Sequence, residues 1–307
     1  TSGGISTGLD HIKELGVTHI QFLPLFDYGS VDESGKSGEQ YNWRYDPMNF
    51  NVPEGSYSTD PFNGEVRVKE VKEMVQSLHN DGISVVMDVV YNHAFDGGNF
   101  CYNKIVPNYF SRFYGEGNWS NGSGVGNDIA TERTMARNFI VDSIMHWVEQ
   151  YHIDGFRFDL AGLIDTQTIN EIVNTVHAKY PNVMFYGEGW GVGGTAVEEG
   201  FTLATKDQAW QTPGFAYFND TFRNDIAGDN GHSWGFATGD WGKADAMGNY
   251  FRASNGWSTT PSQTVNYVSC HDNYSLIDKI IISRNGAYWE EMVKMNNLSA
   301  AIYMMAQ

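Results

Sequence analysis

The sequence predicts an α/β fold built on a mostly parallel β-sheet. Short β-rich runs alternate with amphipathic helical runs along the chain, which is the pattern of α/β proteins. Hydrophobic residues make up 41% of the 307 residues, enough for a large core. We see no internal repeat or low-complexity linker, and one α/β barrel of about 250 residues would fill most of the chain. We therefore expect a single domain over residues 1–307.

Six apolar runs are predicted to be the strands of this sheet. The clearest is 83–90, a nearly continuous apolar run that suits a strand buried on both faces. The weakest is 215–218, which is short. In chain order, the predicted strands are 18–25, 83–90, 154–160, 183–186, 215–218 and 265–270.

Amphipathic periodicity predicts helices between these strands. In the run after Asn63, Val68, Val71, Val75 and Leu78 recur at helical spacing. Glycine or proline follows several of the runs and marks their ends. The predicted helices are 6–15, 65–80, 131–151, 166–180 and a last one from 289 to the end of the chain.

Three long stretches do not fit a helix or a strand. They are rich in Gly, Asn, Ser, Asp, Tyr and Trp, and each follows a predicted strand. Loops of this length in a compact domain are usually functional or hold small insertions. The loops after the strands build the site in a parallel α/β fold, so we expect the site at 26–63, 94–128 and 189–264.

Composition excludes several classes of partner. The chain carries 19 Lys and Arg against 37 Asp and Glu, a net charge of −18, which disfavours nucleic acid and anionic membranes. No apolar run is long enough to predict a membrane-spanning helix. Cys101 and Cys270 make no disulfide framework, and no Gly-rich phosphate loop is present. We therefore expect no required cofactor.

Polar and ionisable side chains follow four of the predicted strands at the same edge of the sheet. The strand ends read Asp88-Val-Val-Tyr-Asn92-His93, Arg157-Phe-Asp159, Glu188-Gly-Trp190 and His271-Asp272. A barrel brings these edges together at one mouth. A single acid after a strand is often only a helix cap, but this set indicates a hydrolytic site.

The residue types suit glycoside hydrolysis. Two carboxylates about 5–5.5 Å apart act as nucleophile and acid/base in a retaining mechanism. Asp159 lies two residues after Arg157, on the same side of its strand, and a neighbouring guanidinium keeps a carboxylate ionised. Glu188 lies beside Trp190, and an apolar neighbour favours a proton donor. Asp272 is a third acid, which we expect to stabilise the oxocarbenium-like transition state electrostatically.

Together, the four segments resemble the four signature regions of the α-amylase superfamily, glycoside hydrolase family 13. The resemblance is ordered, well spaced and covers nearly the whole chain. It implies a TIM (β/α)8 barrel with Asp159 as nucleophile, Glu188 as general acid/base and Asp272 as transition-state stabiliser. It also implies that other residues contact the sugar or support the carboxylates, namely Arg157, His93, His271, Asp88 and Asn92.

A further segment, Tyr41-Asn-Trp-Arg-Tyr-Asp-Pro47, resembles the YNWGYDP heptapeptide of type I pullulanases. The stretch 51–60, the Glu-Gly-Trp after the acid/base region and Phe218-Asn-Asp are also similar to that subfamily. The resemblance implies cleavage of α-1,6 branch links in pullulan, starch or glycogen-derived dextrins. It implies Tyr45 as a platform under the sugar, with Asp46 and Trp190 as further substrate contacts.

Two alternatives to this reading stay open. One is another α-glucan-acting member of the same family, isoamylase-like or α-1,4-acting. The other is a non-catalytic glucan-binding fragment, which the presence of Asp159, Glu188 and Asp272 together disfavours. Asp96 and Asp128 lie in Gly- and Asn-rich loops, where calcium is a possible ligand.

The resemblance also leads to two expectations about departures from the family. A barrel needs eight strands, so we expect the first and last to be missing and the chain to continue into N- and C-terminal parts of a longer enzyme. The family heptapeptide has Gly where this chain has Arg44. If this position needs a positive φ, Arg44 costs about 1–2 kcal/mol, and its long cation is expected to affect substrate preference.

Overall fold

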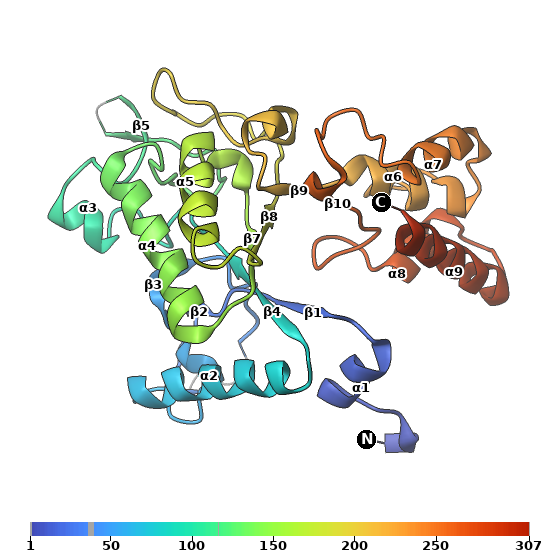
Figure 1. The fold of residues 1–307 in the computed structure, drawn as a ribbon, viewed down its shortest axis with the longest axis horizontal. Helices are drawn as coiled ribbons and strands as arrows, with labels where there is room; N and C mark the ends of the chain where they lie inside the picture. Colours follow the sequence, from blue (N-terminus) through green and yellow to red (C-terminus); the bar gives the residue numbers. More distant parts are fainter. Residues whose placement is uncertain (1, 36–39, 116, 307) are drawn as a thin grey trace. The chain divides into compact units, whose positions relative to one another are not determined.

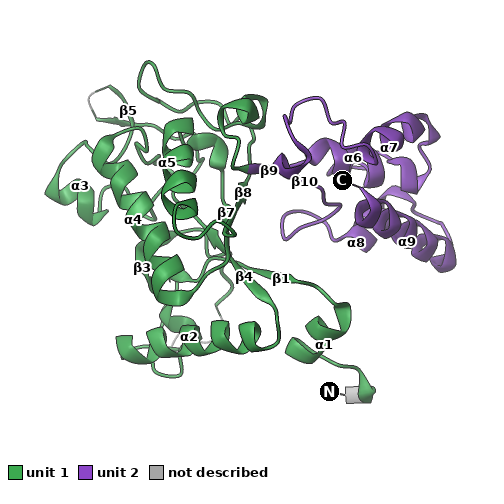
Figure 2. Ribbon diagram, viewed as in Figure 1, with its two compact units in different colours: residues 1–215 green, residues 216–307 purple. Residues whose placement is uncertain are grey.

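The computed structural model describes residues 2–35, 40–115 and 117–306. Its contacts divide the chain into two compact units, Thr1–Phe215 and Ala216–Gln307 (Figure 2). Each unit is described by itself below. The prediction of a single domain stays a prediction.

Unit 1 is built on parallel strands that pair in the order β1, β4, β7 and β8 (Figure 1). These strands are β1 (His19–Phe22), β4 (Ser84–Val89), β7 (Gly155–Phe158) and β8 (Met184–Gly187). They confirm four of the predicted strands, with somewhat shorter bounds. In β4 every residue after Ser84 is buried, as its continuous apolar run predicts.

The helices of unit 1 connect these strands in sequence. They are α1 (Gly8–Leu15), α2 (Gly64–Asn80), α3 (Cys101–Ile105), α4 (Thr134–Tyr151) and α5 (Thr166–His177). Four of them confirm predicted helices, and α3 lies in a stretch predicted as loop. The Asn63 side chain caps α2, and Asp165 caps α5 by accepting a hydrogen bond from Thr168 N. α4 and α5 pack against each other.

The loop after β1 holds a β-hairpin that the sequence did not reveal. β2 (Phe26–Tyr28) pairs with β3 (Pro47–Pro53) in antiparallel fashion, with register shifts between the pairs. Phe50 of β3 stacks on Tyr91 with ring centroids 5.6 Å apart, and its carbonyl accepts a hydrogen bond from Trp147 Nε1 at 2.9 Å. The hairpin is therefore part of the core of unit 1.

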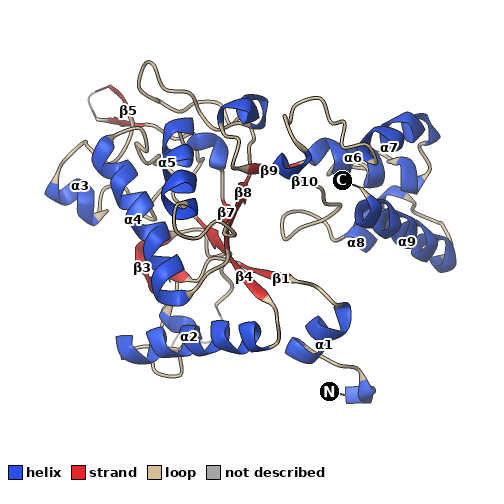
Figure 3. Cartoon of the chain, viewed as in Figure 1, coloured by secondary structure: helices blue, strands red, loops and turns tan. Residues whose placement is uncertain are grey.

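Two further short strands lie in the long loop after β4, where the sequence predicted an irregular segment. β5 (Phe113–Gly115) pairs with β6 (Asn118–Trp119) in antiparallel fashion. Short 3-10 helices account for other parts of the predicted loops (Figure 3). Within the predicted loops of both units, these are Gly55–Tyr57, Lys206–Gln211, Phe236–Thr238, Trp241–Lys243 and Pro261–Gln263. Two others, Ser2–Gly4 and Ala161–Leu163, lie outside those loops.

Unit 2 contains the last two predicted strands and several helices. β9 (Ala216–Phe218) pairs in parallel with β10 (Thr264–Val265). The helices are α6 (Asp220–Ala227), α7 (Ala244–Tyr250), α8 (Leu276–Ser283) and α9 (Trp289–Met305). Of these only α9 was predicted. Their buried cluster consists of Phe222, Ile226, Ala237, Met247, Tyr250, Val268 and Ile302.

The predicted strand 265–270 was too long. β10 ends at Val265, and the segment after it leaves the ladder, so that Cys270 is exposed. An apolar run alone does not show where strand pairing stops. Within the described ranges, none of the helices has the length and apolar character needed to cross a membrane.

The backbone of Arg44 is left-handed, with φ of 73°. The condition under which Arg44 was expected to carry a steric cost, a positive φ, is therefore met. The Arg44 guanidinium lies 5.0 Å from the centroid of the Tyr57 ring. It lines a cavity of about 370 Å³ together with apolar side chains of β1 and α2, among them Phe22, Val71 and Met74.

Replacing Arg44 separates the backbone strain from the side-chain contact. Arg44→Ala and Arg44→Gly both remove the contact with Tyr57, but only glycine removes the steric cost of a positive φ. We expect Arg44→Gly to be more stable than Arg44→Ala by about 1 kcal/mol. Denaturant unfolding of both variants measures this difference. An Ala variant as stable as the Gly variant would contradict a strained backbone at this position.

Candidate active site

A single buried arginine holds three carboxylates at the carboxyl edge of the unit 1 sheet. The Arg157 side chain is 2% exposed. Its Nη1 lies 3.0 Å from Asp88 Oδ1 and 3.0 Å from Asp159 Oδ1, and its Nη2 lies 2.5 Å from Glu188 Oε1. The predicted convergence of strand ends is therefore present for these four residues.

The register of the sheet explains this convergence. Asp88 of β4 pairs directly with Arg157 of β7, so their side chains leave the sheet on the same face. Asp159 is two residues beyond Arg157 and shares that side, since side chains alternate along a strand. Glu188 follows the last residue of β8, the neighbour of β7.

Asn92 and His93 support Asp159 from the loop after β4. Asn92 Nδ2 donates hydrogen bonds of 2.9 Å to both the carbonyl and the Oδ2 of Asp159. The His93 ring lies between Asn92 Oδ1, at 2.6 Å, and the Tyr45 carbonyl, at 2.8 Å. Burial lowers the pKa of His93, and nearby acceptors and carboxylates oppose this only in part. His93 thus links the Tyr45 segment to the carboxylate cluster.

Tyr45 joins the cluster directly. Its hydroxyl donates to Asp88 Oδ2 at 2.7 Å, and the Arg157 guanidinium carbon lies 5.8 Å from its ring centroid. Burial and the Asp88 carboxylate raise the pKa of Tyr45 far above its ordinary value, so its hydroxyl remains a donor. The neighbouring Asp46 accepts a hydrogen bond from Ser30 N and thereby stabilises the loop that carries Tyr45.

Glu188 is held by the turn that follows the nucleophile candidate. Its Oε2 accepts a hydrogen bond of 2.9 Å from Leu160 N, and its carbonyl accepts another of 2.9 Å from Gly162 N. Leu160 reaches this position through a left-handed backbone with φ of 40°. These contacts of Glu188 are polar. The Trp190 ring, which the sequence places beside Glu188, lies 5.9 Å from the Lys206 ammonium.

Glycines allow the ends of β7 and β8 to approach each other. A Cβ on Gly162 would lie 2.1 Å from the Trp190 carbonyl oxygen, and a Cβ on Gly187 would lie 2.5 Å from the Phe158 carbonyl oxygen. Both distances are too short for any side chain, and both obstacles are backbone. The spacing between Asp159 and Glu188 therefore depends on these two glycines.

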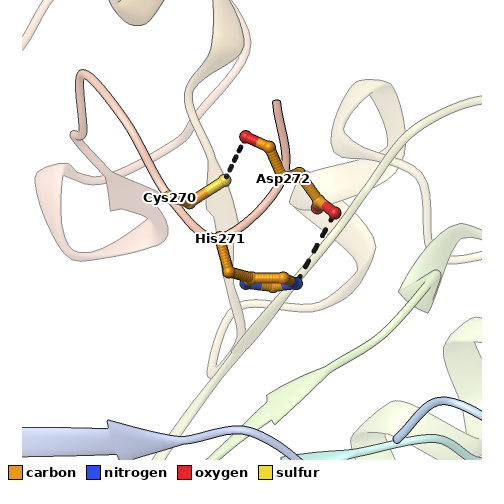
Figure 4. Close-up of side chains that lie close together, drawn as sticks. All are labelled: Cys270, His271 and Asp272. Atoms are coloured by element: carbon orange, nitrogen blue, oxygen red, sulfur yellow. Dashed lines mark hydrogen bonds and ion pairs between the residues drawn. The ribbon is translucent and has the colours of Figure 1, made fainter. Parts of the chain in front are cut away.

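His271 and Asp272 lie in unit 2, after β10. His271 Nε2 is 3.6 Å from Asp272 Oδ1, and Cys270 Sγ is 3.7 Å from the Asp272 carbonyl oxygen (Figure 4). The next residue, Asn273, has a left-handed backbone with φ of 65°, which sharpens the turn at Asp272. The sugar-contacting role of His271 and the stabilising role of Asp272 stay predictions.

The two candidate calcium ligands have other partners. Asp128 is buried and accepts hydrogen bonds from Ser120 Oγ, Thr195 Oγ1, Gly122 N and Ser123 N. Burial acts to raise its pKa, but these donors outweigh it and hold the pKa below its ordinary value. The Asp96 carboxylate accepts from Asn99 N and Nδ2. Both carboxylates thus accept hydrogen bonds from other groups of the chain.

Sequence reasoning missed a second acidic cluster near the hairpin. Asp27, Glu33 and Glu54 bring carboxylate oxygens within 4.8 Å of one another. Arg67 pairs with Glu33 and lies 3.7 Å from Asp27 Oδ1, so the cluster includes its own cation. The residues are far apart in sequence, and no local pattern signals them.

Sequence reasoning also missed the positions that shape the turn after β7. Leu160 and Gly162 act through their backbones, so their side-chain types carried no chemical signal. The only available sign was the glycine at 162, which is ambiguous without a structure.

Asp88 gives the protein a specific pH dependence. Burial raises the pKa of Asp88 to about 7, although Arg157 opposes the shift. In the unfolded chain Asp88 loses its proton near pH 4, so between pH 4 and 7 the folded state binds more protons. Its stabilising contribution is therefore largest below pH 4 and falls as the pH rises to 7, by up to about 1.4 kcal/mol per pH unit.

The variant Asp88→Asn removes this titration. We expect the unfolding free energy of the parent, relative to Asp88→Asn, to fall as the pH rises from 5 to 7. Urea unfolding at several pH values measures it, with Asp10→Asn in exposed α1 as the control for the loss of one carboxylate. A pH-independent difference for Asp88→Asn would show that Asp88 is already ionised at pH 5.

Comparison with known proteins identifies relatives of the chain. The family model described as the catalytic domain of alpha amylase matches residues 2–106. The chain is 40% identical to a pullulanase of Bacillus subtilis (strain 168), across 100% of this chain and 44% of the relative. It is 35% identical to pullulanase A of Streptococcus pneumoniae serotype 2, across 89% of this chain and 22% of the relative.

Solved structures agree with the sequence matches. A pullulanase from Paenibacillus barengoltzii, in complex with maltohexaose and α-cyclodextrin, superimposes with a TM-score of 0.96 at 44% identity. The match covers 100% of this chain and 49% of that one. The type I pullulanase of Bacillus subtilis str. 168, complexed with maltose, gives a TM-score of 0.94 at 39% identity, covering 100% and 44%.

The chain spans less than half the length of these relatives. Within that span, its curled parallel sheet has the fold of an α-amylase catalytic domain. The resemblance stated from the sequence motifs is confirmed. Residues 2–106 therefore match the catalytic domain of alpha amylase, as the motifs of glycoside hydrolase family 13 predict, and the relatives that the chain resembles over its length are pullulanases, type I among them.

Proposed function

We propose that the protein is a retaining glycoside hydrolase that cleaves α-1,6 links in pullulan, starch or glycogen-derived dextrins. The observation that carries this proposal is the contact of Asp159 and Glu188 with neighbouring nitrogens of one guanidinium, that of Arg157. Such an arrangement is compatible with the separation of about 5–5.5 Å that retention requires.

Asp159 is the proposed nucleophile. Its carboxylate attacks the anomeric carbon and forms a covalent glycosyl-enzyme, while the bond to the leaving oxygen breaks. Arg157 Nη1 and Asn92 Nδ2 donate to its two oxygens, which fixes the direction of the carboxylate. Tyr45 lies over Arg157 and supplies an aromatic face for the sugar beside the nucleophile.

Glu188 is the proposed general acid/base. It protonates the leaving oxygen in the first step and takes a proton from water in the second, so that water attacks the glycosyl-enzyme and restores the α configuration. Because Glu188 pairs with Arg157, the substrate must displace or weaken this pair before the proton is delivered. Both steps use side chains of the chain alone.

The remaining site residues have proposed supporting roles. Asp272 stabilises the oxocarbenium-like transition state, and the other residues contact or orient the sugar. The latter are Asp46, His93, Arg157, Trp190 and His271. The choice of α-1,6 links rests on the Tyr45 heptapeptide and on the names of the pullulanase relatives.

We further infer that the sheet is part of a (β/α)8 barrel. The described residues contribute six parallel strands, β1, β4, β7 and β8 in unit 1 and β9 and β10 in unit 2. A closed barrel of this class needs two more.

The first test removes the nucleophile. We expect Asp159→Asn to lower turnover of pullulan by at least about 10³-fold while glucan binding persists, since only the covalent step is lost. Rates and binding are measured in the whole protein, with Asp10→Asn as the control. Activity of Asp159→Asn close to that of the parent would exclude Asp159 as the nucleophile.

The second test concerns the products. We expect pullulan to yield maltotriose whose first-formed anomer is α, and linear amylose to be nearly untouched. Proton NMR of early digestion reads the anomer, and chromatography reads the product. A β anomer would rule out retention by Asp159 and Glu188. Release of panose or rapid cleavage of amylose would instead favour an α-1,4-acting enzyme of the same family.

A further inference from the structure

The loop between β4 and α4 contains a buried ion pair that the proposed chemistry does not use. The side chains of Arg112 and Glu132 are both 0% exposed. Arg112 Nε and Nη2 donate to the Glu132 carboxylate at 3.0 and 2.7 Å. A buried pair of this kind contributes little net stability compared with apolar packing, so its presence calls for another explanation.

The rest of the Arg112 guanidinium contacts the segments that follow β7 and β8. Its Nη1 donates to the Leu163 carbonyl at 2.8 Å and to Thr195 Oγ1 at 3.0 Å. Leu163 lies four residues after Asp159, and Thr195 lies seven residues after Glu188. One buried side chain therefore connects the two segments that carry the proposed catalytic carboxylates.

Hydrogen bonds continue from Arg112 to the Glu188 carboxylate. Leu163, whose carbonyl Arg112 holds, donates through its N–H to the Leu160 carbonyl at 2.9 Å. Leu160 in turn donates to Glu188 Oε2 at 2.9 Å. Leu160 has the strained left-handed backbone noted above, and such a conformation persists only when the surrounding structure holds it.

A second contact of the same loop reinforces this arrangement. Asp128 Oδ2 accepts a hydrogen bond from Thr195 Oγ1 at 2.9 Å, next to the bond from Arg112. A Cβ on Gly122 would lie 2.9 Å from both Leu163 and Thr195, so the loop packs tightly against both segments. The loop thus forms a buried support behind the turn at Leu160.

We propose that Arg112 is a positioning residue that sets the direction of the Glu188 carboxylate through the Leu163 carbonyl and the Leu160 N–H. The inference rests on the proposed role of Glu188 as the acid/base. Arg112 touches no substrate. Its loss is expected to impair proton delivery by Glu188 and to leave nucleophilic attack by Asp159 largely intact.

The test uses the whole protein and three variants. Arg112→Lys keeps a cation for Glu132 but loses the planar fork that reaches Leu163 and Thr195. Arg112→Gln with Glu132→Gln removes both buried charges together, which guards against misfolding from one unpaired charge. Arg133→Gln is the matched control, because Arg133 precedes the first residue of α4 and its side chain binds Glu198 and the carbonyls of Asn108, Tyr109 and Ser111 rather than Leu163.

Two substrates separate positioning from general damage. On pullulan, which needs proton donation, we expect kcat of both Arg112 variants to fall about 10- to 100-fold with little change in KM. On α-maltotriosyl fluoride with azide, neither fluoride departure nor azide attack needs Glu188, so we expect rates near those of the parent. Arg133→Gln should match the parent on both substrates.

Several results would overturn the inference. A folded Arg112→Lys variant with the parent's kcat on pullulan would show that only the charge matters, and equal losses on both substrates would show general structural damage. Circular dichroism and the unfolding midpoint establish that each variant is folded. The proposed cleavage of α-1,6 links is refuted by a different result, namely a parent protein that cleaves the fluoride and amylose but not pullulan. In that case the Arg112 variants are compared with the parent on amylose.

Discussion

The site depends on the burial of one guanidinium. Taking the charge of Arg157 out of water is expensive, and the cost is offset only because Asp88, Asp159 and Glu188 surround it. Conversely, three carboxylates at one edge of a sheet repel one another unless a cation lies between them. Each acid therefore stabilises the others through Arg157, and the geometry of the cluster follows from the pairing of β4, β7 and β8. Fold and site are thus determined by the same register.

Much of this was predictable from local sequence, for a physical reason. Apolar runs mark buried strands, and residues in the last part of a run or just after it lie near the sheet edge, so Asp88, Asp159 and Glu188 were placed without a structure. Contacts between segments that are far apart in the sequence produce no such local pattern. The hairpin of β2 and β3 packs Phe50 on Tyr91, yet its sequence is polar enough to suggest a loop. The pair of Arg112 and Glu132 is likewise separated from Leu163 and Thr195 by long stretches of chain.

Backbone conformation was the other feature that the sequence did not predict. Gly162 and Gly187 are needed because carbonyl oxygens of the neighbouring strand end lie where a Cβ would be, and Leu160 is left-handed because its N–H points at Glu188. None of these requirements follows from residue type. A positive φ at Arg44, which the structure shows, could be raised from the sequence as a condition only because the family heptapeptide has glycine at that position.

The charge balance of the cluster connects its structure to the proposed reaction. One guanidinium faces three carboxylates, so the cluster is net negative when all are ionised. An oxocarbenium-like transition state is positive, and negative surroundings stabilise it more than they stabilise a neutral glucan. Too many ionised acids would repel one another, and the pKa of Asp88, near 7 because of burial, limits that repulsion at neutral pH. Protonation of Asp88 changes the charge of the cluster without changing either carboxylate that is proposed to act on the sugar. Asp88 lies in the strand itself with a side chain that is 0% exposed, whereas the proposed catalytic carboxylates of Asp159 and Glu188 lie at the strand ends and are partly exposed, so the acid that adjusts the charge is separate from the acids that would meet the substrate.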